Sequence, residues 1–190
     1  MMKRLFALQY VKHVRMVGAI APSSEFLARK MVAPINFMKA KTIIEFGPGT
    51  GSFTKILVGR MRPGTKLLLI EHNQAFYDSL VQQFASEPNV IIAHDTAANL
   101  EELLKKHTLP TKVDYIVSGL PFASLSRETS VAILSAVVRH LNAGGVFITF
   151  QYTRLMKTLF SRYFPTIVSR REWRNIPPAY VLECRTEPRR

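Results

Sequence analysis

Residues 41–51, KTIIEFGPGTG, decide the fold of this chain. Thr42, Ile43 and Ile44 form a short β-branched apolar run, which is typical of a strand buried on both faces. Glycines alternate with other residues over positions 47–51, and a helix-like segment starts at Ser52. A glycine turn between a strand and a helix exposes bare backbone at the carboxyl end of a parallel sheet. The segment therefore predicts a ligand site at the start of an α/β domain.

Two common phosphate-binding motifs do not match this turn. In the dinucleotide pattern G-x-G-x-x-G the last glycine would fall on Ser52 or Thr54, depending on the register. A P-loop would need Gly-Lys-Ser/Thr at the end of the turn, which is absent. What remains is an acid, Glu45, followed by three alternating glycines. About twenty residues on, the apolar run 66–70 ends in Glu71, the position of a carboxylate that binds both hydroxyls of a ribose.

This pattern resembles motif I of the class I S-adenosylmethionine-dependent methyltransferases, in which the glycines pass under the methionine part and the ribose. The resemblance implies S-adenosylmethionine as the cofactor, S-adenosylhomocysteine as its product, and no metal. The alternatives are a tight strand–helix turn with an ordinary surface Glu71 and, for Asp95, a helix N-cap. The cofactor-binding residues that the resemblance implies are Glu45, Gly47, Pro48, Gly49, Thr50, Gly51, Glu71, His72, Asp95, Thr96 and Ser118.

Composition indicates one domain over residues 1–190. The chain is 47% hydrophobic and 21% charged, which suits a single full core. Cys184 is the only cysteine, so no internal disulfide can form, and a reducing cytoplasm is expected. No apolar run approaches the roughly 18–20 residues that span a bilayer. The basic N-terminus lacks the apolar core and cleavage site of a secretory signal.

The net charge of +13 predicts attraction to a polyanion, either nucleic acid or an anionic membrane surface. Residues 1–17 contain no acid, and Phe6, Tyr10, Val14 and Val17 share one side of a helix on which basic residues lie largely opposite. This pattern is typical of an interfacial membrane helix. It equally fits a helix packed on the domain with its basic side in water.

From Ile43 onward strands and helices alternate, which predicts a mostly parallel sheet with helices on both faces. With the resemblance, the expected fold is a Rossmann-like methyltransferase with a seven-stranded sheet. Residues 1–36 form an N-terminal helical cap over the cofactor side, and residues 41–190 form the core. The strands expected after the first are 66–70, 90–93, 113–117, 146–151, one around Ile167, and 180–184, and the helices are 25–31, 53–61, 74–85, 100–107, 127–141 and 154–163.

The acceptor is expected at the end of the fourth strand, where residues 118–122 read SGLPF. This segment resembles the Asn-Leu-Pro-Phe/Tyr motif of rRNA adenine dimethylases, whose Asn side chain helps to hold the amine and whose aromatic stacks on the base. Gly119 stands where that Asn belongs. One of the two groups that orient a planar amino group is missing, which counts against adenine.

Three segments, residues 17–24, 118–121 and 173–179, resemble bacterial phospholipid N-methyltransferases. That family converts phosphatidylethanolamine stepwise to phosphatidylcholine, and its N-terminal helix docks on anionic membranes. The resemblance covers nearly the whole chain, and it implies a cytoplasmic enzyme associated peripherally with the inner face of the cell membrane. Phe122, where the family often has an aliphatic residue, and an arginine-rich tail are departures.

The predicted function is thus N-methylation of phosphatidylethanolamine at the membrane surface. RNA adenine N6-methylation is the alternative, and a binding module without turnover is a third hypothesis, against which the intact glycines and Glu71 argue. Gly119 is expected to leave room for a tetrahedral amine. The protonated amine is expected to lose its proton to Tyr152, to a water at residues 118–122, or through its own desolvation in the pocket. The predicted catalytic residues are Ser118, Gly119, Leu120 and Tyr152, and the predicted substrate-binding residues are Tyr10, Pro121 and Phe122 with Arg154 and Arg174 for the lipid phosphate.

For these last side chains the sequence leaves a second interpretation open. The aromatic rings of Tyr10, Phe122 and Tyr152 could hold a methylated ammonium by cation–π contact, worth roughly 0.5–2 kcal/mol each. Tyr10 could instead face the core, and either Arg154 or Arg174 could form a surface ion pair.

Overall fold

The structure is a computed structural model that describes residues 24–153 and 156–187. The predicted helix within residues 1–17 lies outside these residues, as do Tyr10 and Arg154. The described part contains a seven-stranded sheet in the order β3-β2-β1-β4-β5-β7-β6, which confirms the predicted class. Its strands are β1 (Thr42–Phe46), β2 (Lys66–Glu71), β3 (Val90–His94), β4 (Val113–Ser118), β5 (Leu141–Gln151), β6 (Thr166–Glu172) and β7 (Ala179–Arg185).

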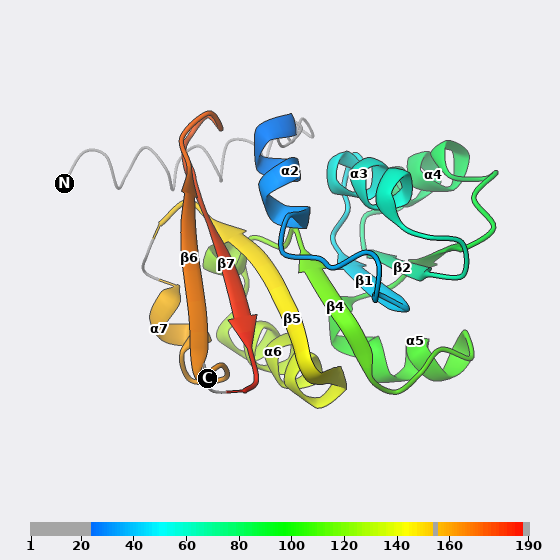
Figure 1. The fold of residues 1–190 in the computed structure, drawn as a ribbon. Helices are drawn as coiled ribbons and strands as arrows, with labels where there is room; N and C mark the ends of the chain where they lie inside the picture. The colour runs from blue at the N-terminus through cyan, green and yellow to red at the C-terminus, as the bar shows by residue number, and fades with distance from the viewer. Residues whose placement is uncertain (1–23, 154–155, 188–190) are drawn as a thin grey trace.

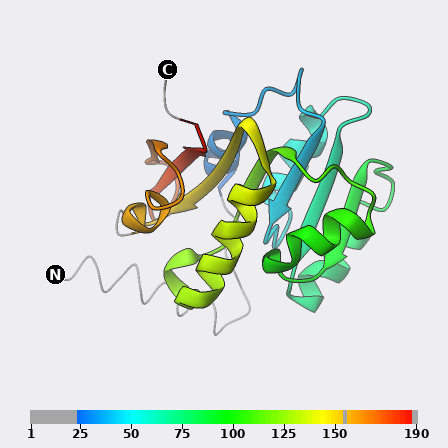
Figure 2. The ribbon, with the colours of Figure 1, turned by 90° about the horizontal axis from the view of Figure 1, so that it is seen from below.

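Helices cover both faces of this sheet (Figures 1 and 2). One face carries α2 (Glu25–Val32), α3 (Ser52–Arg60) and α4 (Gln74–Gln83), and the other carries α5 (Leu100–Lys106), α6 (Arg127–His140) and α7 (Lys157–Phe160). Two 3-10 turns, η1 (Ala97–Asn99) and η2 (Phe122–Ser124), follow β3 and β4. None of the helices in the described ranges is long and apolar enough to cross a bilayer.

The pairing of the strands creates one ligand edge. β1 pairs in parallel with β2 and with β4, and β4 pairs in parallel with β5. Only the last two pairs, β5–β7 and β6–β7, are antiparallel. The strand order changes direction between β1 and β4, and ligands of open α/β sheets bind in the crevice at such a switch point. In register, Phe46 lies between Ile70 of β2 and Ser118 of β4.

Two element boundaries differ from the sequence prediction. β5 begins at Leu141, five residues earlier than expected, and a register irregularity between Val113 and Tyr115 accommodates the extra length. Gly145 is needed here, because a Cβ on it would lie 2.9 Å from the carbonyl oxygen of Asp114. The helix predicted for 154–163 is, in the described residues, the short α7, Lys157–Phe160.

The loop between β6 and β7 is fastened to the start of α2. Ser24 caps α2 by accepting a hydrogen bond from the Leu27 amide at 3.2 Å, and its hydroxyl donates to the buried Asn175 Oδ1 at 2.8 Å. Lys30 pairs with Glu172 at 2.9 Å. Segments more than 140 residues apart therefore meet. They are two of the three segments that carried the phospholipid methyltransferase resemblance.

Candidate functional site

The glycine turn after β1 is held open by backbone conformation. Gly47, Gly49 and Gly51 all have positive φ, at +61°, +56° and +79°. The Gly47 amide donates to the Ile70 carbonyl of β2 at 2.9 Å, which fixes the turn to the neighbouring strand. A Cβ on Gly49 would meet nothing within 4 Å. The turn thus presents bare backbone toward open space, as a bound nucleoside requires.

Glu71 closes the other side of this turn. The side chain is buried, yet both carboxylate oxygens accept backbone hydrogen bonds: Oε2 from the Gly49 amide at 3.0 Å and Oε1 from the Asn73 amide at 2.8 Å. Each carboxylate oxygen has a second lone pair available for a ligand hydroxyl. The structure therefore brings the predicted acid against the predicted glycines in an orientation fixed before any ligand arrives.

Glu45 is a buried acid with one unpartnered oxygen. Its Oε2 accepts a 2.8 Å hydrogen bond from the Thr54 hydroxyl of α3, while Oε1 is buried with no hydrogen-bond partner among the described residues. Burial raises the pKa of Glu45 to about 8, and the nearby Glu71 charge acts in the same direction against the Thr54 hydrogen bond. An orphaned buried carboxyl beside the turn suits a ligand that carries an ammonium group, as S-adenosylmethionine does.

The end of β3 lies beside Glu71, because the Asp95 amide donates to the Glu71 carbonyl at 3.1 Å. Oδ1 of Asp95 accepts from the Thr96 amide at 2.7 Å and from Asn99 Nδ2 at 2.8 Å, and Asp95 is not the helix N-cap that the sequence left as an alternative. Thr96 in turn caps η1. His72 is exposed, and its carbonyl pairs with the His94 ring at 3.0 Å.

Gly119 contradicts one expectation. Its amide donates to the Phe46 carbonyl at 2.8 Å, and a Cβ on it would lie 2.6 Å from the carbonyl oxygen of Gly47. The space beside Gly119 is therefore taken by the glycine turn, and it is not room for an acceptor amine. Ser118 is buried and accepts from the Leu120 amide at 3.3 Å, and Leu120 covers Gly47. Pro121 is exposed.

The prediction that Phe122 lines the acceptor pocket is wrong for this structure. Its side chain is 1% exposed and packs edge-on against Phe160 and Phe147, with ring centroids 5.2 and 6.3 Å away. The physical reason is η2, which turns the ring back into the core as soon as β4 ends. Tyr152 is half-buried at the end of β5, and its ring lies edge-on to Phe150 at 5.5 Å.

Arg174 takes part in an internal ion pair. Its Nε and Nη2 donate to the two oxygens of Glu172 at 3.0 and 3.2 Å, and its guanidinium lies 4.2 Å from the centre of the Phe26 ring. These hydrogen bonds, with that of Lys30, hold the pKa of Glu172 at about 2. Of the two interpretations of Arg174, phosphate binding or an ion pair, the structure shows the ion pair.

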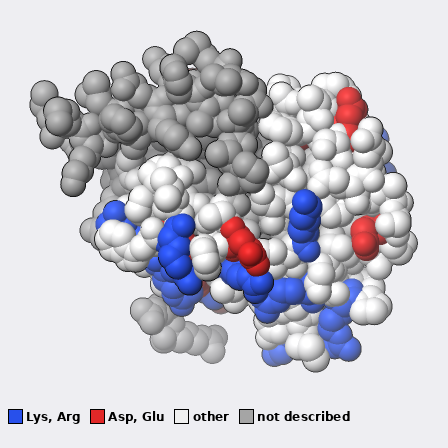
Figure 3. All heavy atoms as spheres, turned by 90° about the horizontal axis from the view of Figure 1, so that it is seen from above, with Lys and Arg blue, Asp and Glu red and all other residues white. Residues whose placement is uncertain are grey.

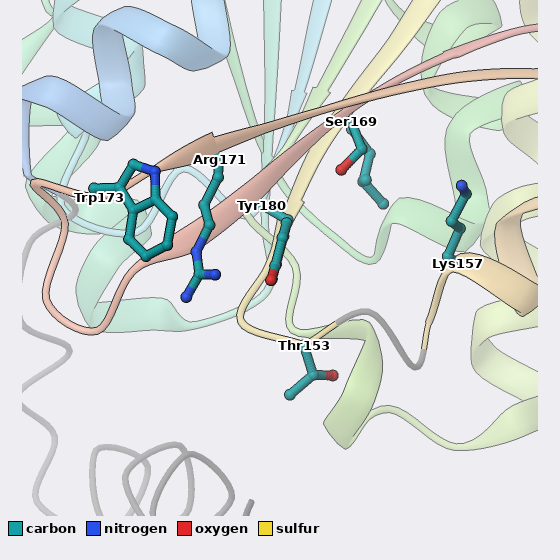
Figure 4. Close-up of a pocket in the computed structure, with 7 residues that line it drawn as sticks. Thr153, Lys157, Ser169, Arg171, Trp173 and Tyr180 are labelled. Atoms are coloured by element: carbon teal, nitrogen blue, oxygen red, sulfur yellow. The ribbon is translucent and has the colours of Figure 1, made fainter. Parts of the chain in front are cut away.

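A pocket of about 370 Å³ near the end of β5 was not predicted (Figure 4). Its sequence signal is weak, since Arg171 lies on β6 outside any motif and Trp173 begins the segment 173–179, whose resemblance assigned no role to the tryptophan. Within the described residues no cluster of His, Cys, Asp or Glu could hold a metal ion. The pocket is lined by Thr153, Lys157, Ser169, Arg171, Trp173, Tyr180 and Leu182.

Comparison with known proteins identifies methyltransferase relatives of this chain. The family model described as ribosomal RNA adenine dimethylase matches residues 23–157. An ornithine lipid N-methyltransferase from Singulisphaera acidiphila is 30% identical over 183 residues, which cover 95% of this chain and 94% of that protein. Ribosomal RNA small subunit methyltransferase A from Acidobacterium capsulatum is 27% identical over 129 residues, 68% of this chain and 42% of that protein.

Solved structures share the fold at lower identity. A precorrin-6y C5,15-methyltransferase from Geobacter metallireducens superimposes with a TM-score of 0.63 at 17% identity, covering 85% of this chain and 88% of that one. A TehB-like S-adenosylmethionine-dependent methyltransferase from Corynebacterium glutamicum gives 0.61 at 16% identity, covering 97% and 100%. With the glycine turn and its paired acid in place, this chain belongs to the ribosomal RNA adenine dimethylase family of class I methyltransferases, and its methyl donor is S-adenosylmethionine.

Proposed function

We propose that the protein N-methylates the head-group amine of phosphatidylethanolamine, stepwise toward phosphatidylcholine, at the inner face of the cell membrane. The observation that carries this proposal is the match to a lipid N-methyltransferase over 95% of the chain. That match extends beyond residue 157, where the dimethylase family model ends. The additional part includes the β6–β7 hairpin, whose loop is fastened to α2 through Asn175.

The surface charge supports an anionic partner. The chain has a net charge of +13, and Lys and Arg predominate over Asp and Glu on the face viewed from above (Figure 3). Such a surface attracts anionic lipid and RNA alike. Gly119 favours the lipid, because it supplies no amide oxygen for a planar base amine and its backbone has no room for a side chain.

The residues proposed to hold S-adenosylmethionine surround the switch point. Glu71 would accept hydrogen bonds from the ribose hydroxyls, the glycine turn would pass under the ribose and methionine part, and Glu45 would meet the ammonium group. Asp95 would lie near the adenine. When bound, S-adenosylmethionine supplies an activated methyl group, so the protein has chiefly to position the acceptor.

The acceptor amine is proposed to lie beside Ser118 and Leu120, where backbone oxygens can orient it and where it does not need the space at Gly119 that the glycine turn fills. It must lose a proton to become nucleophilic. Tyr152, a water at this edge, or desolvation of the amine would serve, and the Tyr152 ring would also favour methylated ammonium products by cation–π contact. For the phosphate of the substrate lipid, Arg154 is proposed, because Arg174 lies beyond β6 and is paired with Glu172.

The test is methyl transfer from labelled S-adenosylmethionine to three acceptors offered separately. These are phosphatidylethanolamine vesicles, ornithine lipid vesicles and an rRNA transcript. We expect label in mono-, di- and trimethylated phosphatidylethanolamine. Label in ornithine lipid alone would mean that ornithine lipid, and not phosphatidylethanolamine, is the substrate. Label in RNA with none in either lipid would overturn the proposal in favour of adenine methylation.

A further inference from the structure

The pocket at the β6–β7 hairpin lies on the same edge of the sheet as the acceptor residues. Gln151 at the carboxyl end of β5 is paired with Tyr180 of β7, and Tyr180 is paired with Arg171 of β6. Thr153, just after β5, forms the near wall of the pocket and Lys157 of α7 a further wall (Figure 4). The pocket therefore lies at the edge of the sheet where methyl transfer is proposed, and not at the opposite edge.

Among the residues that the structure describes, Arg171 differs from its neighbours in having no acidic partner. Arg170 is paired with Glu183, and Arg174 is paired with Glu172. Within residues 24–153 and 156–187, no carboxylate forms an ion pair with Arg171 or Lys157, and Arg171 Nε is buried without a hydrogen-bond partner. A buried guanidinium nitrogen left unsatisfied is rare, and it indicates a missing acceptor.

The walls of the pocket suit an oxyanion. The Arg171 guanidinium lies 3.6 Å from the centre of the Trp173 ring and 4.9 Å from that of Tyr180, which holds its plane between two aromatic faces (Figure 4). Arg in a fixed orientation binds phosphate through two parallel hydrogen bonds. Lys157 adds a second positive charge, and Ser169 adds a hydroxyl.

The surroundings favour a phosphate that belongs to a lipid. Trp173 is 66% exposed and Ile176, in the same loop, is 88% exposed. Phe26 of α2, under Arg174, is also exposed. Tryptophan and aliphatic side chains beside basic residues are typical of surfaces that lie in a bilayer interface. A soluble phosphate compound would need no such apolar projection.

The position of the pocket further separates this phosphate from the substrate. β6 lies three strand spacings from β4, about 14 Å at the backbone. The amine and the phosphate of an ethanolamine head group are joined by only two carbons. An amine at Ser118 and a phosphate on Arg171 are therefore best supplied by two different lipids.

We propose that the pocket formed by Arg171, Lys157 and Trp173 binds the phosphate of a membrane phospholipid adjacent to the substrate lipid, and thereby holds the acceptor edge against the bilayer. This inference rests on the proposed lipid function for its biological sense, but the binding itself can be measured without any methyl transfer. This membrane contact of the β6–β7 hairpin is additional to the one predicted for residues 1–17.

The chain provides its own probe, because Trp173 is its only tryptophan. The full-length protein is mixed, without S-adenosylmethionine, with vesicles of phosphatidylcholine alone or with phosphatidylglycerol added. Anionic vesicles should shift the Trp173 emission to shorter wavelength, and brominated acyl chains should quench it. An emission spectrum that stays unchanged while the protein sediments with the vesicles would overturn the proposal.

Variants then test the cations. Arg171→Gln with Lys157→Gln should lower partitioning into the anionic vesicles by on the order of tenfold or more, since each cation near an anionic surface contributes about 1 kcal/mol. The matched control is Arg62→Gln with Lys39→Gln. It also removes one Arg and one Lys charge, but from the exposed loops that precede β2 and β1, at the end of the sheet away from the pocket. Equal losses in both double variants would mean non-specific attraction and would refute the pocket.

Further arms identify the source of the phosphate. Soluble glycerol phosphate should not reproduce the emission shift at phosphate concentrations equal to those of the vesicles. An emission shift with glycerol phosphate, or with RNA and not with vesicles, would mean that the pocket binds that compound and not a lipid. If lipid is methylated but the two double variants bind alike, only this inference fails. If binding depends on Arg171 and no lipid is methylated, only the proposed function fails.

Discussion

The backbone of Gly119 lies so close to that of Gly47 that a Cβ on Gly119 would be 2.6 Å from the Gly47 carbonyl oxygen. One residue follows β4 and the other follows β1, and these strands are neighbours in the sheet. The acceptor segment and the cofactor turn thus form one continuous backbone surface. A change on one side must displace the other.

Gly119→Ala should therefore weaken S-adenosylmethionine binding and lower methyl transfer by about tenfold or more, since small displacements of positioned groups are costly. Calorimetric titration and a methyl-transfer assay measure the two effects. Gly59→Ala is the matched control: its Cβ would meet nothing within 4 Å, and it lies in α3, where alanine should stabilise the fold by about 0.5–1 kcal/mol. Normal cofactor affinity in Gly119→Ala would contradict the close packing.

Glu71→Gln should weaken S-adenosylmethionine binding by about tenfold to a hundredfold, because hydrogen bonds to a charged acceptor contribute about 1.5–3 kcal/mol. The substitution also weakens the acceptor of the Gly49 amide, so both effects have the same sign. Asp78→Asn removes an equal charge from the exposed face of α4 and should leave the dissociation constant unchanged. If the two variants bind alike, Glu71 does not hold the ribose.

Glu45 should make the stability of the free protein depend on pH. Its pKa in the folded state is about 8, above the ordinary value of 4.5, so the folded protein holds a proton that the unfolded chain releases. The resulting stabilisation is complete below pH 4.5 and is lost as the pH rises to 8, by at most about 1.4 kcal/mol per pH unit. Urea denaturation from pH 5 to 9 measures it. Glu45→Gln should flatten this profile, and an unaltered slope would show that another group is responsible.

Asn175→Ala should detach the β6–β7 loop from α2. The side chain accepts from the Ser24 hydroxyl at 2.8 Å and donates to the Pro177 carbonyl at 2.8 Å, and it is buried. Leaving these partners unsatisfied should lower the free energy of unfolding by about 1–3 kcal/mol. Chemical denaturation gives this number, with Asn36→Ala, an exposed residue before β1, as the control. Equal stability of both variants would mean that the loop is held by other contacts.

Cys184 should be inert in the folded protein. Its thiol is fully buried in β7, between Phe147 and Ile167 in the register, and burial raises its pKa. A thiol reagent at neutral pH should label it only after denaturant is added, and because it is the only cysteine the labelling rate reports the opening of β7. Rapid labelling of the native protein would show that this strand opens on its own.

Much of the fold follows from local patterns along the chain. The alternation of strands and helices from Ile43 onward predicted the mostly parallel sheet with helices on both faces, and the positions of the glycine turn and of Glu71 at the ends of the first two strands placed both at one edge of it. These features depend on residues close together in sequence or on the regular pairing of parallel strands. The structure places them as expected.

What the sequence did not predict depends on contacts between distant segments. The long β5 depends on Gly145 against Asp114, and the burial of Phe122 depends on rings from β5 and α7. The pocket at Arg171 arises only when the hairpin meets the end of β5. No residue pattern within one segment predicts such contacts between distant segments. A residue type such as phenylalanine after a proline suits a core position and a ligand wall equally well.

The position of β7 has a consequence for how the protein is made. Because Ala179–Arg185 enters between β5 and β6, β6 has no partner in the sheet until that segment has left the ribosome. During translation the outer edge of β5 and both edges of β6 thus stay unpaired after β1 to β5 can already pair with one another. Nascent chains that pause between residues 172 and 179 should accordingly be prone to recruit chaperones or to aggregate through these edges.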